Sequence, residues 1–495
     1  MTIQEGVSSV ASGHSGADVD TAVDSQERRQ FWILLVTMAG TFLALLDSFI
    51  VNVAIPSIQR DLGANLAEIQ LIVGGYTLVY GLLLITGGRL GDIRGYRPTF
   101  IVGVLVFIVA SAACALASSP GALIAFRVAQ GVGAALFYPQ VLSILQTAFS
   151  GRRRTMAFGV FGATIGLASI AGQVLGGILT SADLFGLGWR TIFLINVPVG
   201  LLAVVGAWRV LPRTRSDSPP RLDLVGSVIV SVALGMLVLP LVIGREIGWP
   251  VWTTVLLAAS VPALIGYVAW ENRVARRGGD PLTDPALFRS GPFAAGSGIA
   301  LAFFSGNAAL FLLLTLELQT GLGMSALGAG LVFVPLSAAF MISSVVAPRL
   351  TPRFGNGVLT FGYVLNAAGT ALLIGTSAVL GPDLTGPAMI PSLILIGFGQ
   401  GLGVSPLLGA VLSAVPPREA GAASGVMETL IQIAMSLGIA VIGLIFFTLL
   451  GPVEGVVDPA HATRAFTLAL IANLVVALIA IPLTRRLPPM RRAGG

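Results

Sequence analysis

Four ionisable side chains lie in stretches that are otherwise apolar: Asp47, Arg127, Glu317 and Glu428. Moving a charged group to the centre of a bilayer costs about 2.5 to 3.5 kcal/mol on insertion scales, so such residues are candidates for function. A carboxyl group in a low dielectric is driven towards its uncharged form and can therefore exchange a proton near neutral pH. We predict that these four residues carry proton coupling.

Asp47 lies about 22 Å from the start of the apolar run 31–56, at a rise of 1.5 Å per residue. Small or polar residues recur around it at steps of three and four, which places them on one stripe of a helix: Thr37, Gly40, Thr41, Ala44, Ser48, Val51 and Asn52. We expect this stripe to face a water-filled cavity, because lipid offers a carboxylate no partner. The alternative is a fixed hydrogen-bonded pair that locks two helices together.

Arg127 lies in "AFRVAQGVGAALFYPQ", where helical spacing puts Gln130 and Tyr138 on the same face. A guanidinium cannot shed its proton, so it needs a carboxylate or dense hydrogen bonding. Gln130 and Asp47 are both possible partners. A purely structural role is the alternative.

Glu428 shares a helix face with Ser424, Gly425 and Gln432. It is expected to carry protons or to select cationic substrates, and an ordinary residue of an inner vestibule is the alternative. Glu317 is expected at the outer end of its span, where water is near. The alternative to a functional role for Glu317 is a simple position at the membrane interface.

The elements that position these residues are membrane spans. The 495 residues are 55% hydrophobic and 10% charged, whereas soluble proteins carry about 25% charged residues. A bilayer core needs roughly 20 apolar residues per helical span. Fourteen such runs occur, centred near Leu43, Thr77, Phe107, Gly133, Leu167, Leu201, Ala233, Ser260, Phe303, Phe333, Ala367, Ile396, Leu437 and Val475. We predict an all-α integral membrane protein.

An even number of spans puts both termini on one side of the membrane. With the termini in the cytoplasm, the arginines expected outside are only Arg60, Arg190, Arg245 and Arg464, which fits the positive-inside rule. All six tryptophans then fall at span ends, where the ring favours the interface.

The composition excludes several kinds of site. The net charge of +6 reflects topology, and we expect no nucleic-acid partner. One cysteine, Cys114, and two histidines, His14 and His461, cannot build a disulfide, a metal cluster or a Cys/His catalytic pair. The chain has no lysine and hence no Walker-type phosphate loop. We expect no metal and no cofactor, with a proton gradient as the energy source.

The loops divide the spans six, two and six. The predicted parts are a disordered cytoplasmic tail (1–29), an N-terminal six-helix bundle (30–212), a linker with a two-helix hairpin (213–272), a cytoplasmic loop (273–290), a C-terminal six-helix bundle (291–487) and a cytoplasmic tail (488–495). "RLGDIRG" (89–95) and "RLTPRFG" (349–355) repeat Arg, Leu and Gly after the second span of each six-span block. Duplicated halves of this kind hold substrate at the midplane between them.

Five motifs in chain order resemble those of the major facilitator superfamily, specifically its fourteen-span drug:proton antiporter family. They are "LLDSFIVNVAIPSIQRDLGA" (45–64), "GRLGDIRGYR" (88–97), "RVAQGVGAA" (127–135), a set of glycines in the fifth span and "GWRTIFLINVPVG" (188–200). The resemblance covers the chain from about Phe31 onward. It implies the major facilitator fold, with two six-helix bundles and an inserted hairpin, and a role of Arg127 in proton transfer.

Two of the motifs imply moving parts. The loop motif implies a conformational latch formed by Gly88, Asp92, Arg94, Gly95 and Arg97, in which Asp92 pairs with arginines or faces a helix N-terminus. The fifth-span motif implies antiporter glycines at Gly159, Gly172, Gly176 and Gly177. Ile93 and Gln173 depart from the family pattern. Glycine-rich faces also fit plain close packing of helices.

The leading hypothesis is proton-coupled antiport that exports a hydrophobic, cationic drug or antibiotic across the bacterial cytoplasmic membrane by alternating access, in a protein that works as a monomer. The expected substrate cavity is lined by Asn52, Gln130, Tyr138, Gln173, Asn307 and Gln432. The alternative is a dedicated exporter or importer of one metabolite, such as a self-made antibiotic, a siderophore or a peptide. An enzyme is disfavoured, because no nucleophile with a base is visible.

Overall fold

The computed structural model describes residues 16–64, 66–182, 186–213, 223–244, 247–283, 286–324, 326–413, 415–416, 419–450 and 458–487. Within these residues the chain is nearly all helical and contains no strand. Fourteen helical stretches among them are long and apolar enough to cross a membrane. The prediction of an all-α protein with fourteen membrane helices is confirmed.

The first block of six spans forms the N-terminal half. It consists of α1 (Gly16–Leu62), α2 (Leu66–Arg94), α3 (Tyr96–Ala115), α4 (Pro120–Ala148), α5 (Gly151–Ala182) and a sixth span built from η2 (Gly188–Arg190), α6 (Thr191–Leu194) and α7 (Asn196–Val210). The sequence sets local boundaries: the Ser119 side chain accepts from the Ala122 backbone at the start of α4, and Pro120 occupies the first turn.

The hairpin and the second block of six spans follow. The hairpin is α8 (Leu224–Ile243) and α9 (Val251–Arg276), and a short α10 (Ala286–Arg289) precedes the second block. The C-terminal half consists of α11 (Gly291–Leu316), a π-helical turn η3 (Glu317–Gly321), α12 (Ala326–Phe354), α13 (Gly357–Leu380), η4 (Gly381–Asp383), α14 (Gly386–Ser413), α15 (Ala420–Leu450), α16 (Pro459–Leu483) and η6 (Thr484–Arg486).

Two predicted boundaries are wrong. Residues 16–29 are helical rather than disordered, because they extend the first span without a new nucleation step. The loop expected over 273–290 is shorter, since α9 continues to Arg276 and α10 occupies its end. Residues 1–15 and 488–495, and most of the expected linker, lie outside the described residues.

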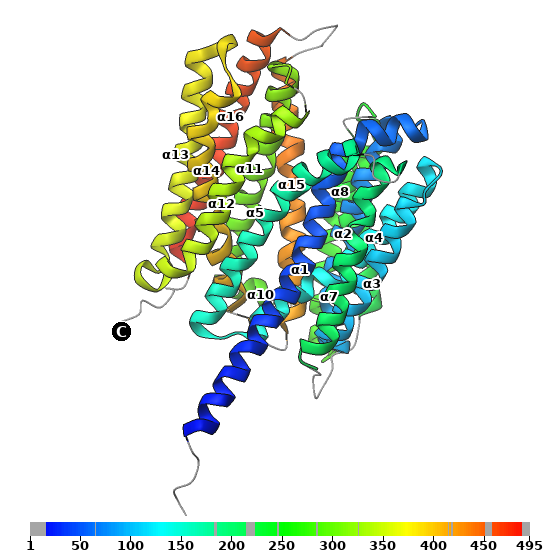
Figure 1. Ribbon diagram of the computed structural model, residues 1–495, viewed down its shortest axis with the longest axis vertical. Coiled ribbons are helices and arrows are strands. Elements are labelled where there is room, and N and C mark those ends of the chain that lie inside the picture. Colours follow the sequence, from blue (N-terminus) through cyan, green and yellow to red (C-terminus); the bar gives the residue numbers. More distant parts are fainter. Residues whose placement is uncertain are drawn as a thin grey trace, which may run out of the picture.

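The two halves lie side by side (Figure 1). The second helix of each block packs against the fifth helix of the other, so that α2 contacts α15 and α12 contacts α5. We call these contacts the α2–α15 seam and the α5–α12 seam. The hairpin lies outside the bundles, and α8 packs against both α2 and α15. It therefore covers one seam.

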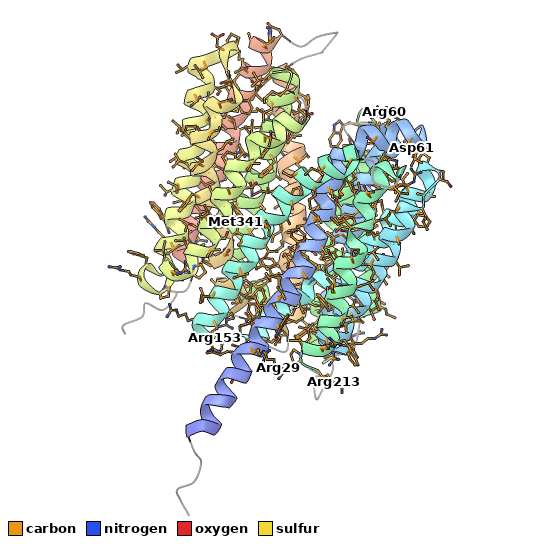
Figure 2. The ribbon with its side chains drawn as sticks, in the orientation of Figure 1. Arg29, Arg60, Asp61, Arg153, Arg213 and Met341 are labelled. Carbon is orange, nitrogen blue, oxygen red and sulfur yellow. The ribbon has the colours of Figure 1, made fainter. Side chains whose placement is uncertain are left out.

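The beginning of α1 and the end of α16 lie at the same end of the molecule (Figure 1). Arg29, Arg153 and Arg213 lie at that end, which we call the arginine-rich end, while Arg60 and Asp61 lie at the opposite end (Figure 2). Both seams are closest towards the arginine-rich end, because they involve the last turns of α2 and the first half of α5.

Candidate functional site

Asp47 of α1 and Arg127 of α4 form an ion pair inside the N-terminal half. Arg127 Nη1 lies 2.5 Å from Asp47 Oδ2, and the two side chains are 1% and 0% exposed. The other oxygen of Asp47 accepts hydrogen bonds from the side-chain amides of Gln130 and Asn196, both at 2.8 Å. The carboxylate is fully paired, and it ties α1, α4 and α7 together.

The Arg127 guanidinium makes further contacts with protein atoms. Its Nε donates to the Ile72 carbonyl at 3.0 Å, and its Nη1 donates to Gln130 Oε1 at 2.7 Å. Its Cζ lies 4.4 Å from the centroid of the Tyr76 ring, a cation–π contact that gains strength when water is excluded. The charge is thus held by three helices and an aromatic face.

Two expectations about this pair need correction. Asp47 does not face a water-filled cavity in this conformation, because three protein donors take the places that water would fill. Gln130 does not line a cavity either, because Arg127 and Asp47 use both ends of its amide. The pairing of Arg127 with Asp47 is confirmed. Asn196 was missed, although a polar amide in the sixth-span motif is a readable signal.

Glu428 of α15 lies at the α2–α15 seam. It is 5% exposed, and within the described residues it makes no hydrogen bond or ion pair. Its helix neighbours Gly425 and Gln432 pack against α2. Tyr80 and Tyr138 of the N-terminal half interact with it electrostatically. A buried carboxyl group without a fixed partner can therefore respond to a proton or a cation at the junction of the halves.

Glu317 lies in η3, at the end of α11, and is 0% exposed. Thr463 Oγ1 of α16 donates to Glu317 Oε1 at 2.6 Å, while Oε2 has no hydrogen-bond partner among the described residues. The expectation that water lies near Glu317 is wrong here, because α16 packs over the turn. The residue belongs to the interior of the C-terminal half.

Asp92, near the end of α2, binds the N-terminus of α15. The backbone N–H groups of Gly421 and Ala422 each donate to one of its oxygens at 2.9 Å, and the Tyr96 hydroxyl donates to Oδ1 at 3.0 Å. The first N–H groups of a helix have no partner within it and favour an anion. Two contacts were predicted for Asp92, an ion pair with arginines or a contact with a helix N-terminus. The structure contains the second.

The other expected latch residues surround this contact. Gly88 lies against the backbone of α15, and Gly95 has a φ of 96° in the turn between α2 and α3, a conformation that favours glycine. Arg97 donates to the Trp208 carbonyl of α7. Arg94 is exposed and, in the part of the chain that the structure describes, unpaired.

Two buried side chains of opposite charge that were not predicted from the sequence, one on the hairpin and one on α2, influence each other electrostatically here. Arg89 of α2 is 6% exposed and Glu271 of α9 is 1% exposed. Arg89 interacts electrostatically with both Asp92 and Glu271. The Thr283 N–H donates to Glu271 Oε2 at 3.1 Å, whereas Oε1 and Arg89 Nε have no hydrogen-bond partner among the described residues. Glu271 escaped notice because it precedes a run of loop charges in the sequence.

The glycines of α5 make the other seam. Gly159, Gly162 and Gly166 pack against α12, and Gly172 packs against Phe49 of α1. Gly176 is buried and Gly177 is half-buried. A side chain at Gly159 would collide with the ring of Pro348. Close packing therefore describes Gly159 and Gly172 in this conformation, and helix movement stays a prediction.

A cavity of about 50 Å³ lies between the halves, bounded by α1, α5, α11 and α12. Its lining residues are Phe49, Ser169, Ile170, Phe311, Thr315, Gly330, Phe333, Val334 and Ser337. None of them is charged, and Phe311 stacks on Phe333 with ring centroids 5.2 Å apart. Drug-sized ligands occupy roughly 300 to 1,000 Å³, so this conformation does not hold one here.

The remaining predicted cavity residues are scattered. Asn307 accepts a hydrogen bond from Gln400 Nε2 at 2.7 Å within the C-terminal half. Tyr138 is buried in an edge-to-face contact with Tyr80. The side chains of Asn52 and Gln173 lie outside the described residues. The aromatic cavity was not found from the sequence, because phenylalanines in apolar spans give no signal of their own.

Asp61 is placed at the opposite end of the molecule, beyond the first span (Figure 2). Trp189 Nε1 donates to its Oδ2 at 3.0 Å, and Arg190 Nη1 lies 2.6 Å from the same atom. These hydrogen bonds, the one from Trp189 first, lower the pKa of Asp61 below its usual value. The contact fixes the start of the sixth span against the end of α1.

Residues 37–439 match the family described as Major Facilitator Superfamily. A protein named "Probable actinorhodin transporter", from Streptomyces coelicolor, is 40% identical over 437 residues, which cover 88% of this chain and 76% of that protein. The "Tetracenomycin C resistance and export protein" of Streptomyces glaucescens is 36% identical, covering 85% and 76%. A multidrug resistance protein of Mycobacterium tuberculosis is 31% identical, covering 84% and 76%.

A solved structure of a proton:xylose symporter of the same superfamily superposes with a TM-score of 0.64, covering 94% of this chain and 97% of that one. The human organic anion transporter MFSD10 gives a TM-score of 0.63, with coverage of 91% and 99%. The identities are 14% and 16%, so these two likenesses concern the fold alone.

Proposed function

The chain belongs to the major facilitator superfamily and is a membrane transporter, and from that premise we propose that it exports a hydrophobic antibiotic or drug in exchange for protons. The observation that carries the proposal is Glu428, a buried carboxyl group without a fixed partner at the seam between the halves. Relatives over more than four fifths of the chain are named as an actinorhodin transporter, a tetracenomycin C resistance and export protein and a multidrug resistance protein.

We place the arginine-rich end in the cytoplasm, following the positive-inside rule. The two seams then close the cytoplasmic side, and this conformation corresponds to the outward-facing stage of alternating access. The opposite stage requires Asp92 to leave the N-terminus of α15. The transporter needs no cofactor in this scheme and works as a monomer in the cell membrane.

Proton coupling requires only that protonation and substrate binding oppose each other. A cation arriving near Glu428 would compete directly with a proton for the same carboxyl group. Asp47 would respond differently, because a proton on it removes the charge that holds Arg127. Release of Arg127 would loosen the packing of α1, α4 and α7. Protonation of Asp47 would thus change the packing of helices at a distance from the α2–α15 seam.

The small aromatic cavity suggests the substrate class. Phe49, Phe311 and Phe333 present apolar faces to the space between the halves, with three hydroxyl side chains as the polar groups. Widening of this space in the transport cycle would suit a flat, aromatic, largely apolar molecule. A positive charge on the substrate would interact with Glu428, because the cavity itself has no charged lining residue.

The test uses purified protein in proteoliposomes with a trapped pH dye and an imposed proton gradient. Addition of lipophilic cations and neutral aromatic antibiotics to the wild type should trigger proton flux. Flux without any response to the compounds, or transport of compounds without flux, would rule out drug:proton antiport.

A second candidate is a dedicated exporter of one self-made antibiotic. It is favoured by the relatives named for single compounds, actinorhodin and tetracenomycin C. A response to one chemical scaffold in the same assay would select it, whereas responses across unrelated scaffolds would select multidrug export.

A further inference from the structure

A pocket of about 530 Å³ opens at the arginine-rich end of the hairpin. It is lined by Ala269, Asn272, Arg273, Arg276, Arg277 and Arg289. Two of the arginines, Arg273 and Arg276, lie in the last turn of α9, Arg277 caps its C-terminus, and Arg289 comes from α10, on the far side of the intervening loop. Four positive charges therefore converge on one concave space from two elements.

None of these four arginines has a partner within the described residues. No ion pair or hydrogen bond of their side chains is present there, whereas Arg127, Arg153 and Arg190 are each paired with a carboxylate. The helix dipole accounts for positive charge in the last turn of α9, but it does not account for Arg289. Like charges gathered around a cavity repel one another unless an anion joins them.

The location indicates which anion. Only 17% of the residues in the apolar stretch of α9 are buried in the protein, so the helix faces lipid along its length. Exposed apolar side chains run up to the pocket, including Val261, Ile265 and Val268. Trp270 directly follows Ala269, which lines the pocket. Tryptophan side chains favour the interface between membrane and water. The pocket is thus at the depth of the lipid headgroups.

We propose that this pocket binds the phosphate headgroup of an anionic phospholipid. The guanidinium groups supply forked donors that match phosphate oxygens, and basic pockets at the cytoplasmic ends of membrane helices suit such headgroups. The acyl chains would lie along the exposed face of α9. The site is separate from the transport pathway, and it anchors the hairpin to the membrane.

The experiment measures lipid retention by native mass spectrometry of the full chain in detergent with mixed phosphatidylglycerol and phosphatidylcholine. R273Q/R289Q removes one charge from each side of the pocket. R485Q/R486Q is the matched control, because it removes two exposed charges outside the pocket, in the turn η6 that follows α16. We expect the wild type and the control to retain phosphatidylglycerol, and R273Q/R289Q to retain it about thirtyfold less tightly.

Equal retention by all three proteins would overturn the proposal. A free anion is distinguished by adding millimolar inorganic phosphate to the wild type: displacement of the lipid would show that the pocket takes soluble phosphate and would overturn the lipid assignment. Thermal unfolding of each variant, and R289Q alone with an intermediate loss, separate a lost contact from a lost fold. Failure here leaves the proton-flux assay of export unaffected.

Discussion

Replacing Asp47 with Asn leaves the Arg127 charge buried without its counter-ion. Removing one partner of a buried ion pair costs about 3 to 5 kcal/mol. The structure favours the lower end, because Arg127 keeps the Ile72 carbonyl, the Gln130 side chain and the Tyr76 ring. We expect D47N to lose about 3 kcal/mol of stability and all substrate-triggered proton flux.

The informative partner is the double variant D47N/R127Q. It removes both charges, and replacing a whole buried pair is often nearly neutral for stability. We therefore expect its thermal unfolding to return close to that of the wild type, measured in detergent. Proton flux in proteoliposomes should stay absent, since the group that accepts the proton and the charge that it releases are both gone.

Two results would refute this reasoning. Wild-type unfolding of D47N would mean that Asp47 does not hold Arg127 in solution. Wild-type flux in a stable D47N/R127Q would mean that the pair only packs three helices together and has no part in coupling.

Three further perturbations test other parts of the structure. Glu428→Gln keeps the size of the side chain, and we expect it to abolish substrate-triggered proton flux while binding of a fluorescent substrate persists; flux at the wild-type rate would exclude Glu428 as the proton carrier. R89Q, E271Q and R89Q/E271Q form a cycle in which the double variant should be more stable than the sum of the single effects by roughly 0.5 to 3 kcal/mol, and additive unfolding data would disprove the electrostatic coupling of Arg89 with Glu271. The pKa of Asp61 is lowered chiefly by its hydrogen bond from the Trp189 indole. Its contribution to folding stability is therefore fully present above the ordinary aspartate pKa of 3.8 and is lost as the pH falls through the lowered pKa. Because the Asp61 side chain is 46% exposed, D61N should lose less than about 1 kcal/mol at neutral pH, and a gap in thermal stability that persists in acid would contradict this assignment.

The fold was predictable because membrane-spanning helices can be recognised from the composition of the sequence. Runs of apolar residues, charged loops and tryptophans at span ends fix the count and the order of the helices. The repeat of residues 89–95 and 349–355 also corresponds to structure, since α2 and α12 end at Arg94 and Phe354, the same point of each repeat. The boundary errors arose where helix continues past the membrane into polar sequence, which hydropathy does not register.

The candidate site was predictable only in part. Intramembrane charge identified Asp47, Arg127, Glu317 and Glu428, because the cost of burial makes each of them conspicuous. Sequence alone could not say which of them are paired, since Asp47 and Arg127 are eighty residues apart and meet only through packing. Glu271 lay hidden beside loop charges, and the aromatic cavity arises from phenylalanines that look like any other apolar residue.

The two seams are held by different forces. Asp92 joins α2 to the N-terminus of α15 through two charge-assisted hydrogen bonds, whereas Pro352 occupies the equivalent position of α12 and offers no carboxylate to α5. Glycines in close contact occur at both seams, such as Gly88 and Gly425 at one and Gly159 and Gly162 at the other, so the anion is an additional contact of the α2–α15 seam alone. Loss of this anion would therefore weaken the contact of α2 with α15 more than that of α5 with α12. The halves would then rotate about an axis near α5 and α12, displaced from the centre of the molecule, and the hairpin beside α2 would travel farthest.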